Sequence, residues 1–129
     1  MKYLCLCYYD QKKFEALTES GLEALGRACR SHDEALRKSG HLLLVGSLAL
    51  PPSSRTVRPG RDRPSVTDGP FVETSEPAGA FFIIEARDMD EAIEVASKHP
   101  AAHVEDLGWG IEVRPIDMFD QPELRHSDR

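Results

Sequence analysis

Two histidines are the residues of this 129-residue chain best suited to moving protons. His99 continues the apolar positions of a predicted helix, after Ala92 and Ala96, and stands at the C-terminal end of that helix. The helix dipole favours a charged imidazolium there, whereas burial favours the neutral ring. A histidine held between these influences could exchange protons near neutral pH. The alternative is a side chain that only caps the last turn or fills the edge of the core.

His32 is the second candidate, because it falls on the apolar stripe of an earlier predicted helix. A polar ring buried on such a stripe needs a hydrogen-bond partner, which Asp68 or Tyr8 could supply. The more common outcome is a boundary residue with a structural partner, because buried polar groups usually find one.

Two acids flank the loop Asp68-Gly69-Pro70-Phe71 and could work with a histidine. A turn-forming Asp usually bonds the N–H two residues ahead, but here that residue is a proline without an N–H. The Asp68 carboxylate therefore either caps the N–H of Phe71 or is free to face a ligand. Asp68 and Glu73 could supply a base and the acid that orients it. A turn cap plus a solvated acid is the alternative.

Other polar and aromatic residues suggest a surface rather than chemistry. Glu85 shares a strand face with Phe81 and Ile83, and a wet rim suits it better than a cavity. Trp109 stands between two glycines, at a pocket mouth or, as we expect, at a dimer seam. Four arginines could attract an anionic substrate, although a charged edge strand explains them more simply; they are Arg55, Arg58, Arg61 and Arg63.

We expect no cofactor and no metal. His99 and His103 are four residues apart, but Pro100 opposes a shared helical face, and no cysteine or acid pattern completes a site. No phosphate loop, dinucleotide turn or nucleophile elbow is present in the sequence. The net charge of −6 opposes a nucleic-acid partner, because phosphate binding needs a basic surface.

The same composition predicts a cytoplasmic protein with no membrane partner. The sequence has neither an apolar run of about 18 residues nor an export leader. The three cysteines are odd in number, and free thiols in a reducing compartment are the simplest interpretation.

The hydrophobic pattern predicts an α+β domain over residues 1–119, with a polar tail at 120–129. We expect a polar loop at 10–13, strands at 2–9, 41–50, 80–86 and 110–116, and a hairpin with arms 56–58 and 65–67. The first helix should run from the cap Thr18 to about residue 38, and the second from 89 to about 99 after a capping box of Asp88 and Glu91. The expected inner faces are Leu22, Leu25, Cys29, His32 and Leu36 on the first helix, and Met89, Ala92, Ile93 and Ala96 on the second.

This order of elements is a ferredoxin-like βαβ-hairpin-βαβ plan with an antiparallel sheet. Two helices cover one face of such a sheet, yet three of the strands are apolar on both faces. Soluble monomers rarely leave an apolar surface of that size exposed, so we expect a homodimer that stacks sheet on sheet.

A family resemblance rests on the Asp68-Gly69-Pro70-Phe71 loop with Glu73 and Glu76 after it. Further matching segments are Met1–Leu4, Gly40–Leu50, Thr56–Arg58, Glu85–Asp88, His99–Ala101 and Ile111–Ile116. The chain resembles the DGPF family of the YCII-related proteins, which are known mainly as small bacterial proteins without an assigned reaction. The resemblance implies a dimeric α+β barrel. In the wider group a helix-borne histidine and an acid are the suspected active pair, and many relatives carry an aspartate before the proline where this chain has His99.

Three functions follow as hypotheses. The first is a small enzyme that acts on an organic molecule by cofactor-independent proton transfer, with His99 and Asp68 or Glu73 as its acid–base groups. The second is a ligand-binding or sensing module with the same cleft and no turnover. The third is an interaction protein, because members of the resembled family occur beside extracytoplasmic-function sigma factors, which such a protein would contact in trans.

Overall fold

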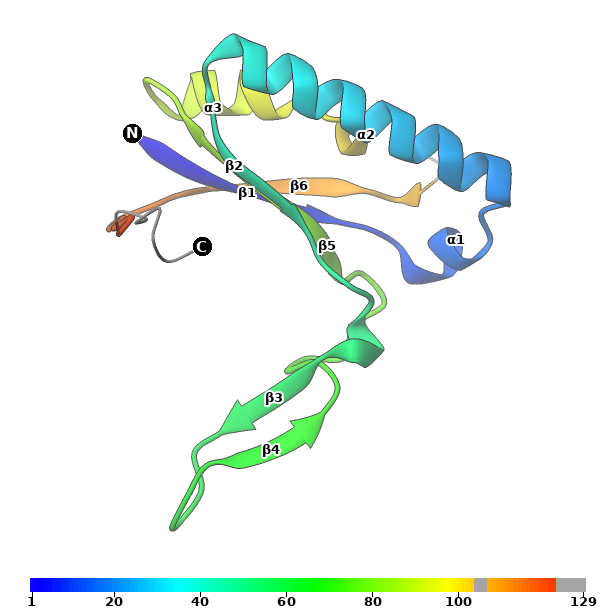
Figure 1. Cartoon of the computed structure of the whole chain (residues 1–129), viewed down its shortest axis with the longest axis vertical. Coiled ribbons are helices and arrows are strands. Elements are labelled where there is room, and N and C mark those ends of the chain that lie inside the picture. The colour runs from blue at the N-terminus through cyan, green and yellow to red at the C-terminus, as the bar shows by residue number, and fades with distance from the viewer. Residues whose placement is uncertain (104–106, 123–129) are drawn as a thin grey trace, which may run out of the picture.

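Four strands form one antiparallel sheet in a computed structural model that describes residues 1–103 and 107–122. The spatial order is β2-β5-β1-β6, where β1 is Lys2–Tyr8, β2 is Leu42–Ser47, β5 is Ala78–Glu85 and β6 is Gly110–Pro115. In Figure 1 the long helix α2 (Glu19–Ser39) and the shorter α3 (Met89–Ala96) lie on the same side of this sheet. The predicted ferredoxin-like α+β fold is confirmed.

The element boundaries follow from local capping. The Thr18 hydroxyl accepts the N–H of Gly21 at 3.1 Å where α2 begins, and Gly40 ends that helix with φ +82°, a conformation that favours glycine. The Asp88 carboxylate accepts the N–H of Glu91 at 2.9 Å and starts α3. Asp10 caps a short helix α1, Gln11–Glu15, so the loop expected at 10–13 was wrong. The sequence there has a single apolar residue, Phe14, so no apolar stripe marked it as a helix.

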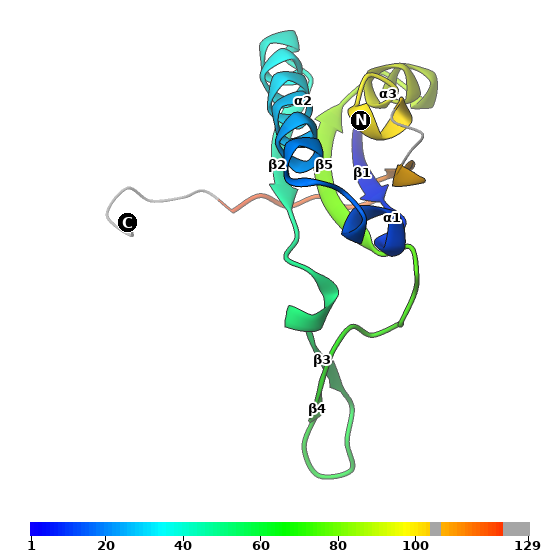
Figure 2. The ribbon, with the colours of Figure 1, turned by 90° about the vertical axis from the view of Figure 1, so that its right-hand side faces the viewer.

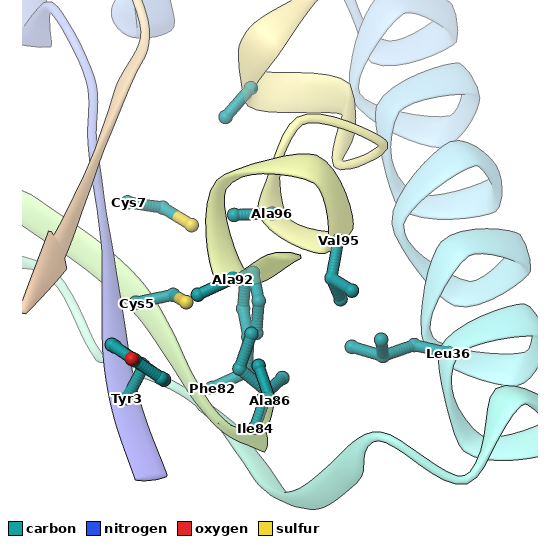
Figure 3. Packing of buried hydrophobic residues seen from close by; sticks show 11 residues of the cluster. Tyr3, Cys5, Cys7, Leu36, Phe82, Ile84, Ala86, Ala92, Val95 and Ala96 are labelled. Atoms are coloured by element: carbon teal, nitrogen blue, oxygen red, sulfur yellow. The ribbon is translucent and has the colours of Figure 1, made fainter. Parts of the chain in front are cut away.

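The core lies between the sheet and the two longer helices (Figure 3). From β1 and β5 it takes Tyr3, Cys5, Cys7, Phe82 and Ile84, each no more than 1% exposed. These residues alternate along their strands, as expected for a sheet with one face covered by helices.

The helices bury less of their predicted faces than expected. In α2 only His32 and Leu36 are buried, whereas Leu22 is 43% exposed. Burial on α2 is thus confined to its C-terminal half. In α3 the buried residues are Ala92, Val95 and Ala96, while Ile93 is 48% exposed. The two expectations that Leu22 and Ile93 face inward were therefore wrong.

A hairpin projects from this body and is called the arm here, residues 55–68. Strands β3 (Arg55–Arg58) and β4 (Ser65–Asp68) pair only with each other. Figures 1 and 2 both show the helices on one side of the sheet and the arm extending away on the other side. A short 3₁₀ turn, η1 (Pro51–Ser53), precedes the arm, and a second, η2 (Pro100–Ala102), follows α3.

No described helix is both long and apolar enough to cross a bilayer. The polar tail predicted at 120–129 falls mostly outside the described residues.

Candidate functional site

A cavity of about 350 Å³ lies between α2, β2, β5 and the segment around η2. We call this cavity the pocket. Its wall contains apolar side chains and a few polar groups, among them Cys29, Asp33, Val45, Phe82, His99 and Trp109. Val45 is the cross-strand partner of the buried Phe82, which places the pocket on the helix-covered face of the sheet.

His99 reaches the pocket from an unexpected element. The helix α3 ends at Ala96, and His99 instead caps the 3₁₀ turn η2. Its Nδ1 accepts the N–H of Ala101 at 2.9 Å, so in the neutral ring the proton is on Nε2. That Nε2 lies 4.0 Å from the Sγ of Cys7. The Nε2 of His99 therefore carries a hydrogen and can donate, and the ring has no free lone pair.

The protonation state of His99 also differs from the expectation. Burial, with a smaller contribution from His32, lowers the pKa of His99 from 6.5 to about 4. The predicted contest between dipole and burial is decided by burial, because His99 stands beyond the end of α3, where the dipole effect is short-ranged. The ring is only 4% exposed and is neutral at pH 7, so the expected proton exchange near neutral pH is not what this geometry gives.

His32 pairs with its sequence neighbour. Its Nδ1 lies 3.2 Å from the Oδ1 of Asp33, and a carboxylate can only accept, so Nδ1 donates. Nε2 of His32 is buried and has no hydrogen-bond partner among the described residues. The predicted partners Asp68 and Tyr8 were wrong, because Tyr8 donates to Glu112 at 3.0 Å and Asp68 lies on the arm.

The two histidine rings are in contact. Their centroids are 4.6 Å apart with an interplanar angle of 76°, an edge-to-face arrangement. On its other side His99 stacks on Phe82 at 5.5 Å with an interplanar angle of 18°. Asp33, His32 and His99 thus form one chain of contacts from the helix α2 to the pocket wall.

The buried thiols of Cys5 and Cys7 are poor nucleophiles. Burial raises the pKa of Cys7 to about 12, with smaller contributions from neighbouring groups, and raises that of Cys5 to about 12. Nucleophilic cysteines react as thiolates, and these two are protonated at neutral pH. Cys7 therefore serves the core rather than covalent chemistry.

Trp109 contributes the other unsatisfied group. Its Nε1–H is buried without a partner among the described residues, and its ring lies 6.1 Å from that of His99. It lines both the pocket and a neighbouring groove of about 430 Å³ beside Ile93. Trp109 thus lines a pocket within one chain, and the expected dimer seam stays a prediction.

The structure does not bring the predicted acids to the histidines within one chain. The side chain of Asp68 is 87% exposed on the arm, and its Oδ1 lies 3.3 Å from the Nε of Arg55. The Phe71 cap is not among the hydrogen bonds of the described residues. Glu73 lines a separate hollow of about 610 Å³ at the base of the arm. The nearby Gly69 takes φ +96°, which explains the glycine in this loop.

Glu85 is found at a rim. Its carboxylate is half-exposed and lies 3.7 Å from the Nζ of Lys2, on the strand face opposite the helices. Among the described residues no three metal-ligating side chains come together.

Sequence reasoning missed Asp33 as a site residue. Adjacent residues on a helix normally point in different directions, so His32 and Asp33 were not considered as a pair. The available signal was Cys29 and Asp33, four residues apart, which line the same pocket.

Comparison with known proteins gives a family but no reaction. The YCII-related domain family matches residues 1–119. The chain is 29% identical over 124 residues to Uncharacterized protein R00369 of Rhizobium meliloti (strain 1021). The aligned region covers 96% of this chain and 98% of that protein. The chain therefore belongs to the family of YCII-related domain proteins.

Proposed function

We propose that this protein binds a small organic molecule in the pocket between α2 and the sheet. The observation that carries the proposal is the buried indole N–H of Trp109, which has no partner among the described residues in the wall of a 350 Å³ cavity. A buried donor without an acceptor costs free energy, and a ligand acceptor would remove that cost. Small-molecule sites typically begin at about 300 Å³ and combine apolar walls with a few placed polar groups.

The wall defines the chemistry of the ligand. Trp109 is a donor in the wall, so the ligand carries an acceptor such as a carbonyl oxygen, whereas the Nε2–H of His99 faces the Sγ of Cys7. Val45 and Phe82 suit an apolar or planar body. Arg30 and Asp33 both line the pocket on α2, so its wall offers one charge of each sign to a polar ligand.

The experiment uses the single tryptophan of the chain, which gives one indole N–H resonance. A library of small aromatic and carbonyl compounds is added to the ¹⁵N-labelled protein, and the indole shift is followed. We expect compounds that move it in the wild type and in Leu22→Phe, a substitution at an exposed position of the same helix. Cys29→Phe should abolish the effect, because it fills the pocket wall.

Two results would contradict the proposal. One is an indole resonance that no compound moves at concentrations of about 1 mM, the weak end of specific binding. The other is binding that Cys29→Phe leaves intact. The first result favours the alternative, an interaction module whose partner is another protein, such as a sigma factor in trans, and the second moves the binding to the neighbouring groove that Trp109 also lines.

Acid–base chemistry beside the pocket is a second candidate function, at His32, which lines a separate cavity of about 110 Å³ behind the pocket wall. It is supported by the contact of Asp33 with His32, which leaves the Nε2 of His32 as a lone pair oriented by an acid. In this proposal Asp33 orients the histidine, the role that the sequence analysis offered to Asp68, and His99 is the neutral ring that packs edge-to-face against His32. Cofactor-independent removal of a proton next to a carbonyl would need these groups alone.

Deuterium exchange tests this chemistry without knowledge of the product. A compound that binds is incubated with the protein in D₂O, and loss of its carbon-bound proton signal is followed by NMR. His32→Gln should abolish exchange, whereas His103→Gln should not, because His103 is exposed and bonds only the backbone of Ser97 in the described structure. Equal exchange in both variants would exclude His32 as the base.

We also propose that the protein is a homodimer. The sheet face opposite the helices carries the cross-strand neighbours Leu4 and Ile83, and Leu6 and Phe81, and no described element covers it. A second sheet stacked on this face would remove the apolar surface from water.

A further inference from the structure

The arm lacks the support that a hairpin needs. It forms a separate two-stranded sheet, and an isolated two-stranded hairpin is marginally stable in water. Its central cross-strand pair is apolar and open to solvent, with Val57 65% and Val66 57% exposed. Phe71 at its base is 64% exposed, and the guanidinium carbon of Arg58 lies over its ring, 4.2 Å from the centroid. A second surface packed against these three side chains would remove them from water.

The charge of the arm points to the kind of surface. Residues 55–68 contain four arginines and two aspartates, a formal charge of +2, so the net charge of −6 leaves −8 on the remaining residues. The arm extends away from its own body, so it cannot satisfy this attraction within one chain. The body of a second copy carries the complementary charge.

The direction of the arm is also informative. Both views place it on the side of the sheet that the helices leave uncovered (Figures 1 and 2). A body stacked on that sheet face would therefore lie beside the arm. On this face Glu85 and Glu112 are paired with Lys2 and Arg114, at 3.7 and 3.2 Å, so the face itself is close to neutral and the negative charge that would attract the arm lies elsewhere on the body.

The sheet alone is small for a stable interface. Four strands about 4.8 Å apart and about seven residues long give a footprint of about 440 Å². A standard interface buries about 800 Å² on each partner. Further area must come from another element, and the arm carries the exposed apolar side chains of Val57 and Val66.

We propose that the arm of each copy docks on the body of a second copy of this chain and completes the dimer. The inference rests on the homodimer proposed above and adds how it is held. In a two-fold arrangement each arm contacts the partner's acidic body, so the contact is made twice. Val57 and Val66 supply the apolar contact, and the arginines supply the attraction.

The test measures the dimer dissociation constant by sedimentation velocity over a dilution series. The wild-type full-length chain is compared with Val57→Ser/Val66→Ser and with Arg61→Glu/Arg63→Glu. We expect each arm variant to weaken the dimer at least about tenfold, and the charge variant to lose more at low salt than at high salt. The matched controls are Leu22→Ser and Arg27→Glu, exposed positions on α2 that should leave the constant unchanged.

The outcomes separate the two proposals. A wild type that is monomeric at every concentration overturns the homodimer and the arm contact together. A wild-type dimer whose dissociation constant is the same in the arm variants overturns the arm contact and leaves the dimer standing. Circular dichroism of each variant should match the wild type, because all the substituted side chains are exposed.

Discussion

The helix-covered body and the arm place their polar residues in opposite surroundings. His99 in the body is 4% exposed and touches three aromatic rings, whereas the side chain of Asp68 on the arm is 87% exposed and faces one arginine. The sequence analysis proposed the two as one acid–base pair, with His99 as the first candidate. Because of this difference in burial, His99 is poorly solvated, whereas water surrounds the carboxylate of Asp68.

Burial makes small polar changes costly in the body. Two ring nitrogens there have no partner among the described residues, and the pKa of His99 is lowered because its charged form is poorly solvated. On the arm, water and salt screen the ion pair of Arg55 with Asp68, and exposed pairs contribute little to stability. This contrast supports the two proposals, ligand binding at the pocket and an intermolecular contact at the arm.

Two phenylalanines give the largest contrast between the regions. Phe82 is 1% exposed and stacks on His99, so Phe82→Ala should lower the free energy of unfolding by about 3 to 5 kcal/mol through lost burial and a cavity. Phe71→Ala on the arm should change it by less than about 0.5 kcal/mol at dilutions where chains are separate. Urea unfolding followed by circular dichroism measures both.

The milder variant Phe82→Leu keeps this comparison usable if Phe82→Ala does not fold. A comparable loss in Phe71→Ala that persists on dilution would mean that the arm is part of the cooperative core. A loss that grows with protein concentration would instead fit an arm docked on a second copy.

Lowering the pH should destabilise the body through His99, and this is the second largest expected effect. The pKa of His99 is about 4 in the folded protein and 6.5 in a free histidine. The unfolded chain therefore binds the proton more readily, and stability is complete above pH 6.5 and falls as the pH drops through 4. The full loss is about 3 kcal/mol, of which about 2 kcal/mol should fall between pH 7 and pH 5.

His99→Asn removes this dependence while keeping an acceptor for the N–H of Ala101. Urea midpoints at pH 7 and pH 5 should differ less in His99→Asn than in the wild type. His103→Gln, at an exposed position, serves as the control and should retain the wild-type slope. Equal slopes in all three proteins would mean that His99 is not buried neutral.

Interactions between residues close in sequence explain why most helices and strands were predictable. Thr18, Gly40 and the pair of Asp88 and Glu91 act within four residues, so their pattern predicts where helices begin and end. Strand alternation in Lys2–Tyr8 likewise fixes which side chains enter the core. These signals do not depend on the rest of the chain.

The site was less predictable because it depends on distances between elements. The histidines were identified as candidates, but their meeting across α2 and η2 has no local signature. The helix α3 ends at Ala96, so His99 is a cap of η2, where burial and not the dipole of α3 sets its pKa. Trp109 lines the pocket within one chain, and the dimer seam expected from its residue type stays a prediction.

A pair of aspartate variants gives the finest test of the contrast, with an effect on spectra rather than on stability. Asp33→Asn replaces the carboxylate that accepts the Nδ1–H of His32, so the ¹⁵N shifts of the His32 ring should change, and those of His99 should follow because the rings touch. Asp68→Asn should leave both rings unchanged, since Asp68 faces Arg55 on the arm. A response of either histidine to Asp68→Asn in the dimer, lost in the arm variants that dissociate it, would show instead that a second copy's arm reaches the pocket. The acid of the signature loop would then belong to the site after all, supplied by the partner and not by the chain that holds the histidines.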